Sequence, residues 1–155
     1  MMRHFFIAAV SLLFFLQGCS GTMKQYQIGR IEISLPETFV AAENRKSSIP
    51  SPIPDGPTTT EHFFSFENKQ GDKLTLFYWE GYPYRDYGPM SEKRSFPFSV
   101  AGQDTKIIQT EMFMGITQEV LVAHRMIPPN DRFMIFSTAL DLGQFKSLLS
   151  TIRIH

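Results

Sequence analysis

The alternation of apolar and polar residues predicts β-strands along most of this chain. Ile31, Ile33 and Leu35 alternate with polar residues, which is the period-two pattern of a strand with one buried face. We expect this strand over residues 26–35, ended by Pro36, and a short helical turn over residues 37–44. Residues 46–60 contain four prolines, and proline removes amide donors and fixes φ, so we expect a long exposed loop there rather than a polyproline recognition segment.

From residue 61 onward the pattern predicts a meander of paired strands. Strands over 61–67 and 73–80 flank Lys69-Gln70-Gly71-Asp72, which has the composition of a hairpin turn. In 73–80 the two faces are both apolar, so both need cover, for which a helix is the usual element. Four more candidate strands follow, separated by Gly102, Gly115 and the Pro128–Asp131 turn: 94–100, 105–114, 116–127 and 133–139.

One helix is predicted, near the end of the chain. Asp141 can cap it, and Gln144 stands three residues later in the capping-box relation. Its apolar stripe has i, i+3, i+4, i+7 spacing and consists of Phe145, Leu148, Leu149 and Ile152. The predicted fold class is therefore α+β: an antiparallel sheet of about six or seven strands with a C-terminal amphipathic helix packed on it.

Two segments of the domain carry a resemblance to a known family. Residues 31–39 (IEISLPETF) and 145–153 (FKSLLSTIR) resemble the corresponding parts of the PsbP-like α/β domains found in small bacterial lipoproteins. The resemblance implies an antiparallel sheet with helices against it and no shared catalytic residues.

The N-terminus has the pattern of a secretory signal. Residues 1–4 are short and cationic, and Phe5–Leu16 form an apolar run that is too short for the roughly 20 residues a membrane-spanning helix needs. Leu16-Gln17-Gly18-Cys19 then resembles a bacterial lipobox. The resemblance implies cleavage before Cys19 by signal peptidase II, and a membrane anchor of acyl chains such as palmitate on that cysteine. Because Ser20, not Asp, follows, it also implies the outer membrane, facing the periplasm.

These features divide the chain into a lipoprotein signal peptide (1–18), a tether (19–25) and a single α+β domain (26–155). Cys19 is the only cysteine, so no disulfide can form within the chain. Fifteen basic residues balance fifteen acidic ones, and the sequence contains no concentrated basic stretch, which argues against a nucleic-acid partner. Fifteen phenylalanines predict a folded, aromatic-rich core.

The sequence offers no motif for catalysis, for a metal or for a cofactor. His62, His124 and His155 show no ligand spacing, and His124 shares a predicted strand face with Val120 and Val122, so we expect a partly buried structural imidazole. No serine nucleophile elbow, phosphate-binding loop, dinucleotide fingerprint or calcium loop occurs. We therefore predict no catalytic residues, no bound metal and no cofactor.

The stretch from Trp79 to Met90 is the candidate binding site. Its aromatic residues and arginine are types enriched at interface hot spots, and its glycines and prolines restrict the loop: Trp79, Tyr82, Tyr84, Arg85 and Tyr87. These rings either cap the core or form a platform for a protein or glycan partner. We expect a non-catalytic, lipid-anchored binding protein of the bacterial envelope, attached to the membrane through Cys19 and with another envelope protein as its partner. The alternatives are an envelope hydrolase acting on peptidoglycan, and an inhibitor or immunity-type lipoprotein that neutralises a toxin or lysozyme.

Overall fold

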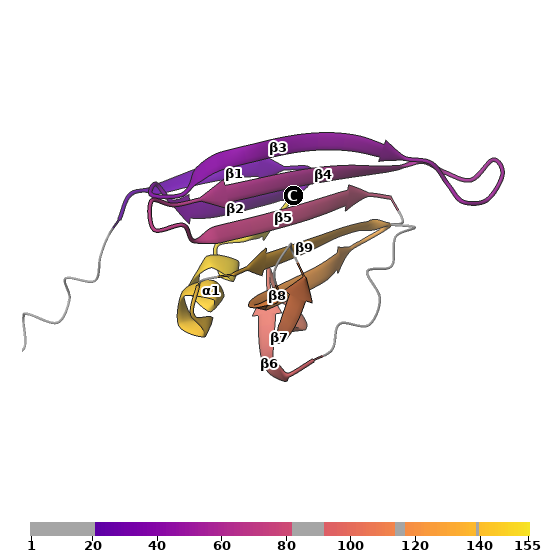
Figure 1. Ribbon diagram of the computed structural model, residues 1–155. Helices are drawn as coiled ribbons and strands as arrows, with labels where there is room; N and C mark the ends of the chain where they lie inside the picture. Colours follow the sequence, from indigo (N-terminus) through magenta and orange to yellow (C-terminus); the bar gives the residue numbers. More distant parts are fainter. Residues whose placement is uncertain (1–20, 82–91, 114–116, 139) are drawn as a thin grey trace, which may run out of the picture.

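The computed structural model describes residues 21–81, 92–113, 117–138 and 140–155, and these form two antiparallel sheets and one short helix (Figure 1). The seven-stranded sheet has the order β3 (Val40–Ile49), β4 (Thr59–Glu67), β5 (Lys73–Glu80), β9 (Asp131–Ser137), β8 (Thr117–Ile127), β7 (Gln103–Phe113) and β6 (Arg94–Val100). The three-stranded sheet has the order β1 (Met23–Ile28), β2 (Ile31–Pro36) and β10 (Arg153–Ile154), and the helix is α1 (Leu142–Leu149). The predicted fold class is confirmed.

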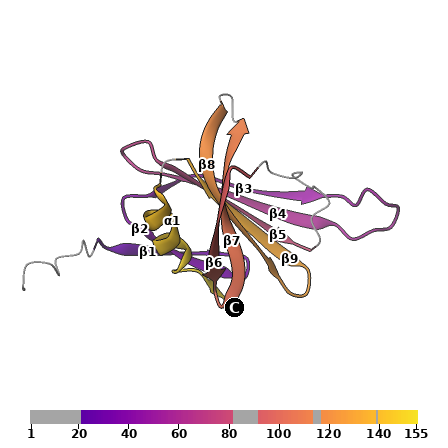
Figure 2. The ribbon, with the colours of Figure 1, turned by 90° about the horizontal axis from the view of Figure 1, so that it is seen from below.

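The large sheet twists strongly along its width. Viewed from below, β3, β4 and β5 run across the molecule, whereas β6, β7 and β8 run steeply past them, with β9 in between (Figure 2). Twist of this kind is the normal consequence of pairing right-twisted strands. It leaves the β3–β4 hairpin projecting at one side of the molecule, away from α1.

The main core lies between the large sheet, the small sheet and α1. Side chains from β2, β5, β9 and α1 supply most of it, all of them buried: Ile31, Ile33, Leu35, Leu74, Leu76, Phe133, Ile135, Phe145, Leu148 and Leu149. A helix was the expected cover for β5. The structure supplies a small sheet as well as the helix, because the helix is only eight residues long and cannot cover the whole face.

The opposite face of the large sheet carries a second core. It contains Trp79 from β5, Met134 and Phe136 from β9, and Val120 and Val122 from β8. Strands β5 and β9 therefore bury side chains on both faces, as the sequence predicts for residues 73–80 and 133–139.

Three N-terminal predictions are wrong. The expected strand 26–35 is a hairpin of β1 and β2 that turns at Gly29 and Arg30, and β1 already begins at Met23, inside the expected tether. Residues 37–44 do not form a helical turn, since β3 begins at Val40. The loop expected over residues 46–60 is shorter in the structure. It consists only of the connection between Ile49 and Thr59, because Lys46–Ile49 pair with β4.

Two further differences lie at the C-terminus: α1 ends at Leu149, so Ile152 of the expected helical stripe is buried outside the helix, and β10 follows where no strand was expected. The other elements match the sequence closely. Strands β5 and β6 have the predicted bounds, and Gly71 and Gly102 adopt positive φ at the two expected turns. At the start of α1, the Asp141 carboxylate accepts the Gln144 backbone N–H and the Gln144 side chain accepts the Asp141 N–H, which completes the predicted capping box. These features are local, so short-range sequence rules suffice to predict them.

Candidate functional site

Most of the binding site expected from the sequence lies outside the described residues. This applies to Tyr82, Tyr84, Arg85 and Tyr87, and also to Cys19. Trp79 is described and is 0% exposed. Its indole N–H donates to Glu61 Oε2 at 2.8 Å inside the second core. Trp79 is therefore a core residue, and its ring is not presented at the surface.

Trp79 belongs to a row of aromatic rings on that face of the sheet. Phe77 packs between Phe63, at 5.1 Å between ring centroids, and Phe136, at 6.1 Å, and it stacks on Trp79 at 5.5 Å. Two guanidinium groups flank the row. Arg45 lies 4.8 Å from the Phe63 ring centre, and Arg132 lies 5.6 Å from that of Trp79. Cation–π contacts of this kind stabilise the rings and tie the edge strand β3 to the second core.

The histidines do not converge. His62 is opposite Tyr78 in the β4–β5 ladder and faces the main core, where its ring contacts Tyr78 at 5.9 Å. Its Nε2 pairs with Glu80 Oε1 at 2.7 Å. His124 is opposite Met134 on the other face of the sheet. Within the described ranges, no group of three or more His, Cys, Asp or Glu side chains could hold a metal ion.

His124 has a perturbed environment, as its predicted partial burial suggests. Desolvation lowers the pKa of its imidazole, and the nearby positive charges of Arg132 and Lys106 lower it further, with Glu92 opposing them. The neutral ring is therefore favoured in the folded protein. This environment is set by packing on the sheet, and His124 is not among the residues that line the two cavities described below.

Strand β3 is a free edge of the large sheet. It pairs with β4 over its whole length, and no other described strand pairs with it. Most of its ten residues are exposed. The Glu43 and Arg45 side chains, 54% and 58% exposed, form an ion pair at 3.7 Å. An edge strand presents unpaired backbone N–H and C=O groups, which can pair with a strand of another protein.

The other edge, β6, is less suited to strand addition. Pro97 in the middle of β6 has no backbone N–H, and prolines are typical of protected edges. On β3, a register shift between Ala41 and Glu43 and several charged side chains protect the edge against unwanted strand pairing. Beyond that shift, β3 runs regularly from Glu43 to Ile49, so this half of the edge is the more favourable for pairing.

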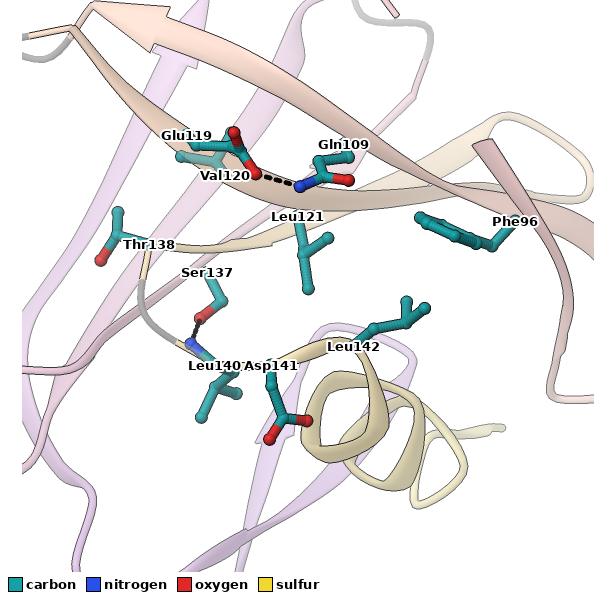
Figure 3. A pocket seen from close by; sticks show the side chains of 10 residues that line it. All are labelled: Phe96, Gln109, Glu119, Val120, Leu121, Ser137, Thr138, Leu140, Asp141 and Leu142. Carbon is teal, nitrogen blue, oxygen red and sulfur yellow. Dashed lines mark hydrogen bonds between the residues drawn. The ribbon is translucent and has the colours of Figure 1, made fainter. Parts of the chain in front are cut away.

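A pocket of about 330 Å³ lies between the start of α1 and strands β6–β9. Figure 3 shows Phe96, Leu121 and Leu142 pointing toward its centre from three separate elements. Val120 and Leu140 add to the apolar lining, and polar groups line the rest. Glu119 accepts a hydrogen bond from Gln109 and lies 3.9 Å from Lys93 Nζ, while the Ser137 hydroxyl accepts the Leu140 N–H at 3.0 Å. The pocket thus combines an apolar interior with two carboxylates, Glu119 and Asp141.

Sequence reasoning did not find β3 or the pocket. Strand β3 lacks apolar alternation because neither of its faces is buried, so the period-two signal is missing. The signal that could have indicated β3 is its position in the chain. It lies between the turn at Pro36 and the strand predicted over residues 61–67, and that strand can pair with it. The pocket is lined by residues from distant parts of the chain, and no sequence pattern marks it.

In the described part of the chain, no helix has the length and apolarity that crossing a membrane requires. No protein-family model, curated protein or solved structure matches this chain.

Proposed function

We propose that this protein is a lipid-anchored lipoprotein of the bacterial cell envelope that acts by binding another envelope protein. The anchor is the acylated Cys19, and the protein is located at the outer membrane, on its periplasmic side. The support for this location is the signal-like segment ending in Leu16-Gln17-Gly18-Cys19, followed by Ser20. Two or three acyl chains are enough for stable attachment, because each buried methylene contributes about 0.8 kcal/mol.

The observation that carries the binding role is the free, exposed edge of β3. An extended segment of the partner adds to this edge through backbone hydrogen bonds, and the side chains of β3 select the partner. Glu43 and Arg45 lie on the same face of the strand and are both more than half exposed. They offer one negative and one positive charge, so the partner segment carries charges in the complementary order.

Site-specific photocrosslinking in living cells tests this role. A benzophenone amino acid at Asn44, on β3, is compared with one at Ser95, an exposed residue of the other edge strand β6. We expect an adduct of one defined mass from residue 44 and none from residue 95, followed by identification of the partner by mass spectrometry. Equal adducts from both positions, or none from residue 44, would contradict binding at β3.

A charge-swapped variant provides the matched control. Glu43→Arg combined with Arg45→Glu preserves net charge and composition, and an exposed ion pair contributes only about 0–1 kcal/mol to stability. We expect the adduct at residue 44 to be lost, while the free energy of unfolding falls by only about 0.5–1 kcal/mol because Arg45→Glu also removes the cation–π contact with the Phe63 ring. If the adduct persists at full yield, the side chains of β3 do not select the partner.

The identity of the captured protein also decides between the forms of binding. A toxin or lysozyme would make this protein an inhibitor or immunity-type lipoprotein, which is the more specific version of the proposal.

The hydrolase alternative is supported by the two carboxylates that line the pocket beside α1. It is tested by digestion of purified peptidoglycan with the intact protein and with Glu119→Gln. Release of soluble fragments by the intact protein only would establish the enzyme instead.

A further inference from the structure

The folded domain begins very close to the proposed lipid anchor. The Glu37 N–H donates to the Thr22 carbonyl at 2.9 Å, and β1 starts at Met23, so the chain belongs to the fold from residue 22 onward. Only Ser20 and Gly21 separate Thr22 from Cys19. A fully extended chain spans at most about 3.6 Å per residue, so the Cα atoms of Cys19 and Thr22 are at most about 11 Å apart.

We propose that one end of the domain, the tether end, rests directly on the lipid headgroups of the membrane that holds Cys19. The tether end consists of residues 21–24, 36–40 and 67–73, which are the start of β1 and the β2–β3 and β4–β5 turns. Figures 1 and 2 both place the start of β1 on this side of the molecule. The two turns adjoin, since residues from both line a shallow cavity of about 610 Å³. The inference rests on the proposed acylation of Cys19.

The chemistry of the tether end suits a headgroup layer. Four large apolar side chains are exposed among the described residues; Met23, at 46%, and Val40, at 61%, belong to this end, whereas Ile53, at 62%, lies alone in the far β3–β4 connection. Its charges balance: Lys24, Lys69 and Lys73 against Glu37, Glu67 and Asp72. A neutral end with exposed apolar side chains is neither repelled by anionic lipids nor dependent on them. Contact with the membrane is therefore governed by the short tether and by the apolar side chains.

This contact orients the whole molecule. Strand β3 leaves the tether end at Val40 and reaches the far side at Ile49, which is about 30 Å at the usual rise of 3.3 Å per residue. The connection between β3 and β4, residues 50–58, lies on the side opposite the start of β1 in both views (Figures 1 and 2). The β3–β4 hairpin therefore projects away from the bilayer, and the edge of β3 stays open to partners along its length.

Energy transfer to the membrane surface tests the orientation. Acylation consumes the Cys19 sulfur, so one introduced cysteine is the only free thiol and can carry a donor dye. Gln70→Cys labels the tether end and Ile53→Cys labels the far hairpin; both positions are exposed. The full lipidated protein is placed in phosphatidylcholine–phosphatidylglycerol vesicles with acceptor dyes on the headgroups. We expect several-fold more efficient transfer from residue 70 than from residue 53.

Equal transfer from the two positions, or stronger transfer from residue 53, would overturn the inference. Intact mass and flotation with the vesicles separate this failure from failure of the proposed anchor: a chain that carries acyl mass and floats but shows equal transfer is anchored without this orientation. A chain without acyl mass that does not float refutes the anchor itself. If Gln70→Cys does not fold, Lys69→Cys on the same turn replaces it.

Discussion

At the scale of single residues, Gly29 in the β1–β2 turn packs directly against Tyr78 of the large sheet. Its φ is +56°, and a Cβ atom at this position would lie 2.2 Å from the Tyr78 ring. The Tyr78 hydroxyl donates to Asp131 Oδ2 at 2.6 Å, so the ring cannot move aside freely. We predict that Gly29→Ala lowers the free energy of unfolding by about 2–4 kcal/mol, from backbone strain and overpacking together, as measured by urea denaturation.

Gly71 is the matched control for this prediction. Its φ is +83°, but nothing lies within 4 Å of the Cβ position. Gly71→Ala should therefore cost only the backbone strain, about 1–2 kcal/mol. Equal losses for the two variants would show that contact with Tyr78 does not matter.

His124 makes the free energy of unfolding depend on pH, and the direction of its shifted pKa gives the sign of that dependence. Desolvation, with Arg132 and Lys106 nearby, holds its pKa below the usual 6.5, so the unfolded chain binds a proton more readily than the folded one. This contribution to stability is fully present above pH 6.5 and is lost as the pH falls below it. We predict that His124→Gln has a flatter stability profile below pH 6.5 than the unmodified protein in urea titrations. Identical slopes would contradict the prediction.

The residue scale also shows what sequence reasoning can and cannot supply. The partial burial of His124 follows from its neighbours at even spacing on one strand, and the structure agrees. The burial of Trp79 depends on Val122, Met134 and Phe136, which reach it from β8 and β9 across the sheet. The apolar pattern of residues 73–80 predicts that Trp79 needs cover, but it does not indicate which distant strands supply that cover.

At the scale of elements, α1 depends on its N-terminal cap. The Asp141 carboxylate accepts the Gln144 N–H at 2.8 Å. We predict that Asp141→Ala lowers the free energy of unfolding by about 1 kcal/mol, whereas Asp141→Asn, which keeps a capping oxygen, changes it little. Chemical denaturation followed by circular dichroism measures both. A similar loss in the two variants would mean that the carboxylate acts through its charge or through the adjoining pocket.

Elements with local signals were predicted well, and elements defined by long-range pairing were not. The α1 cap, the Gly71 and Gly102 turns and the central strands follow from short patterns. Strand β10 is only two residues long and exists because it pairs with β2, more than a hundred positions earlier in the chain. Strand β3 exists because β4 supports it, although its own sequence has no buried face.

The candidate site was less predictable than the fold for the same reason. Aromatic and arginine composition selected the stretch after Trp79, but composition does not reveal which side chains a sheet buries. An edge is defined by a missing neighbour, and strand order cannot be derived from the sequence of a single strand. The open side of β3 therefore becomes visible only in the assembled sheet.

At the scale of the whole molecule, Arg30 joins parts of the chain that are far apart in sequence. From the β1–β2 turn its Nη1 donates to the Pro128 carbonyl at 2.6 Å and its Nε donates to the His155 carbonyl at 2.9 Å. The His155 N–H donates back to the Arg30 carbonyl at 2.9 Å. One guanidinium thus ties the small sheet both to the end of the chain and to the turn between β8 and β9.

We predict that Arg30→Lys lowers the free energy of unfolding by about 1 kcal/mol, although it preserves the charge. A lysine ammonium is a point donor and cannot reproduce the two-pronged geometry. Arg153→Lys, an exposed substitution on β10, serves as the control and should stay within about 0.5 kcal/mol in the same urea assay. If both variants match the unmodified protein, the two carbonyl contacts of Arg30 contribute nothing measurable.

The two cores share β5, β8 and β9, and this sharing determines how the molecule tolerates change. A substitution on either face of these three strands disturbs packing on both sides of the sheet, because the backbone between the faces is common. The outer strands β3 and β6 contribute few buried side chains, so their sequences can vary at little cost. The binding edge proposed for β3 could therefore diversify at the rim of the sheet while the centre is held nearly constant, so a protein with the proposed role would be able to change partners without refolding.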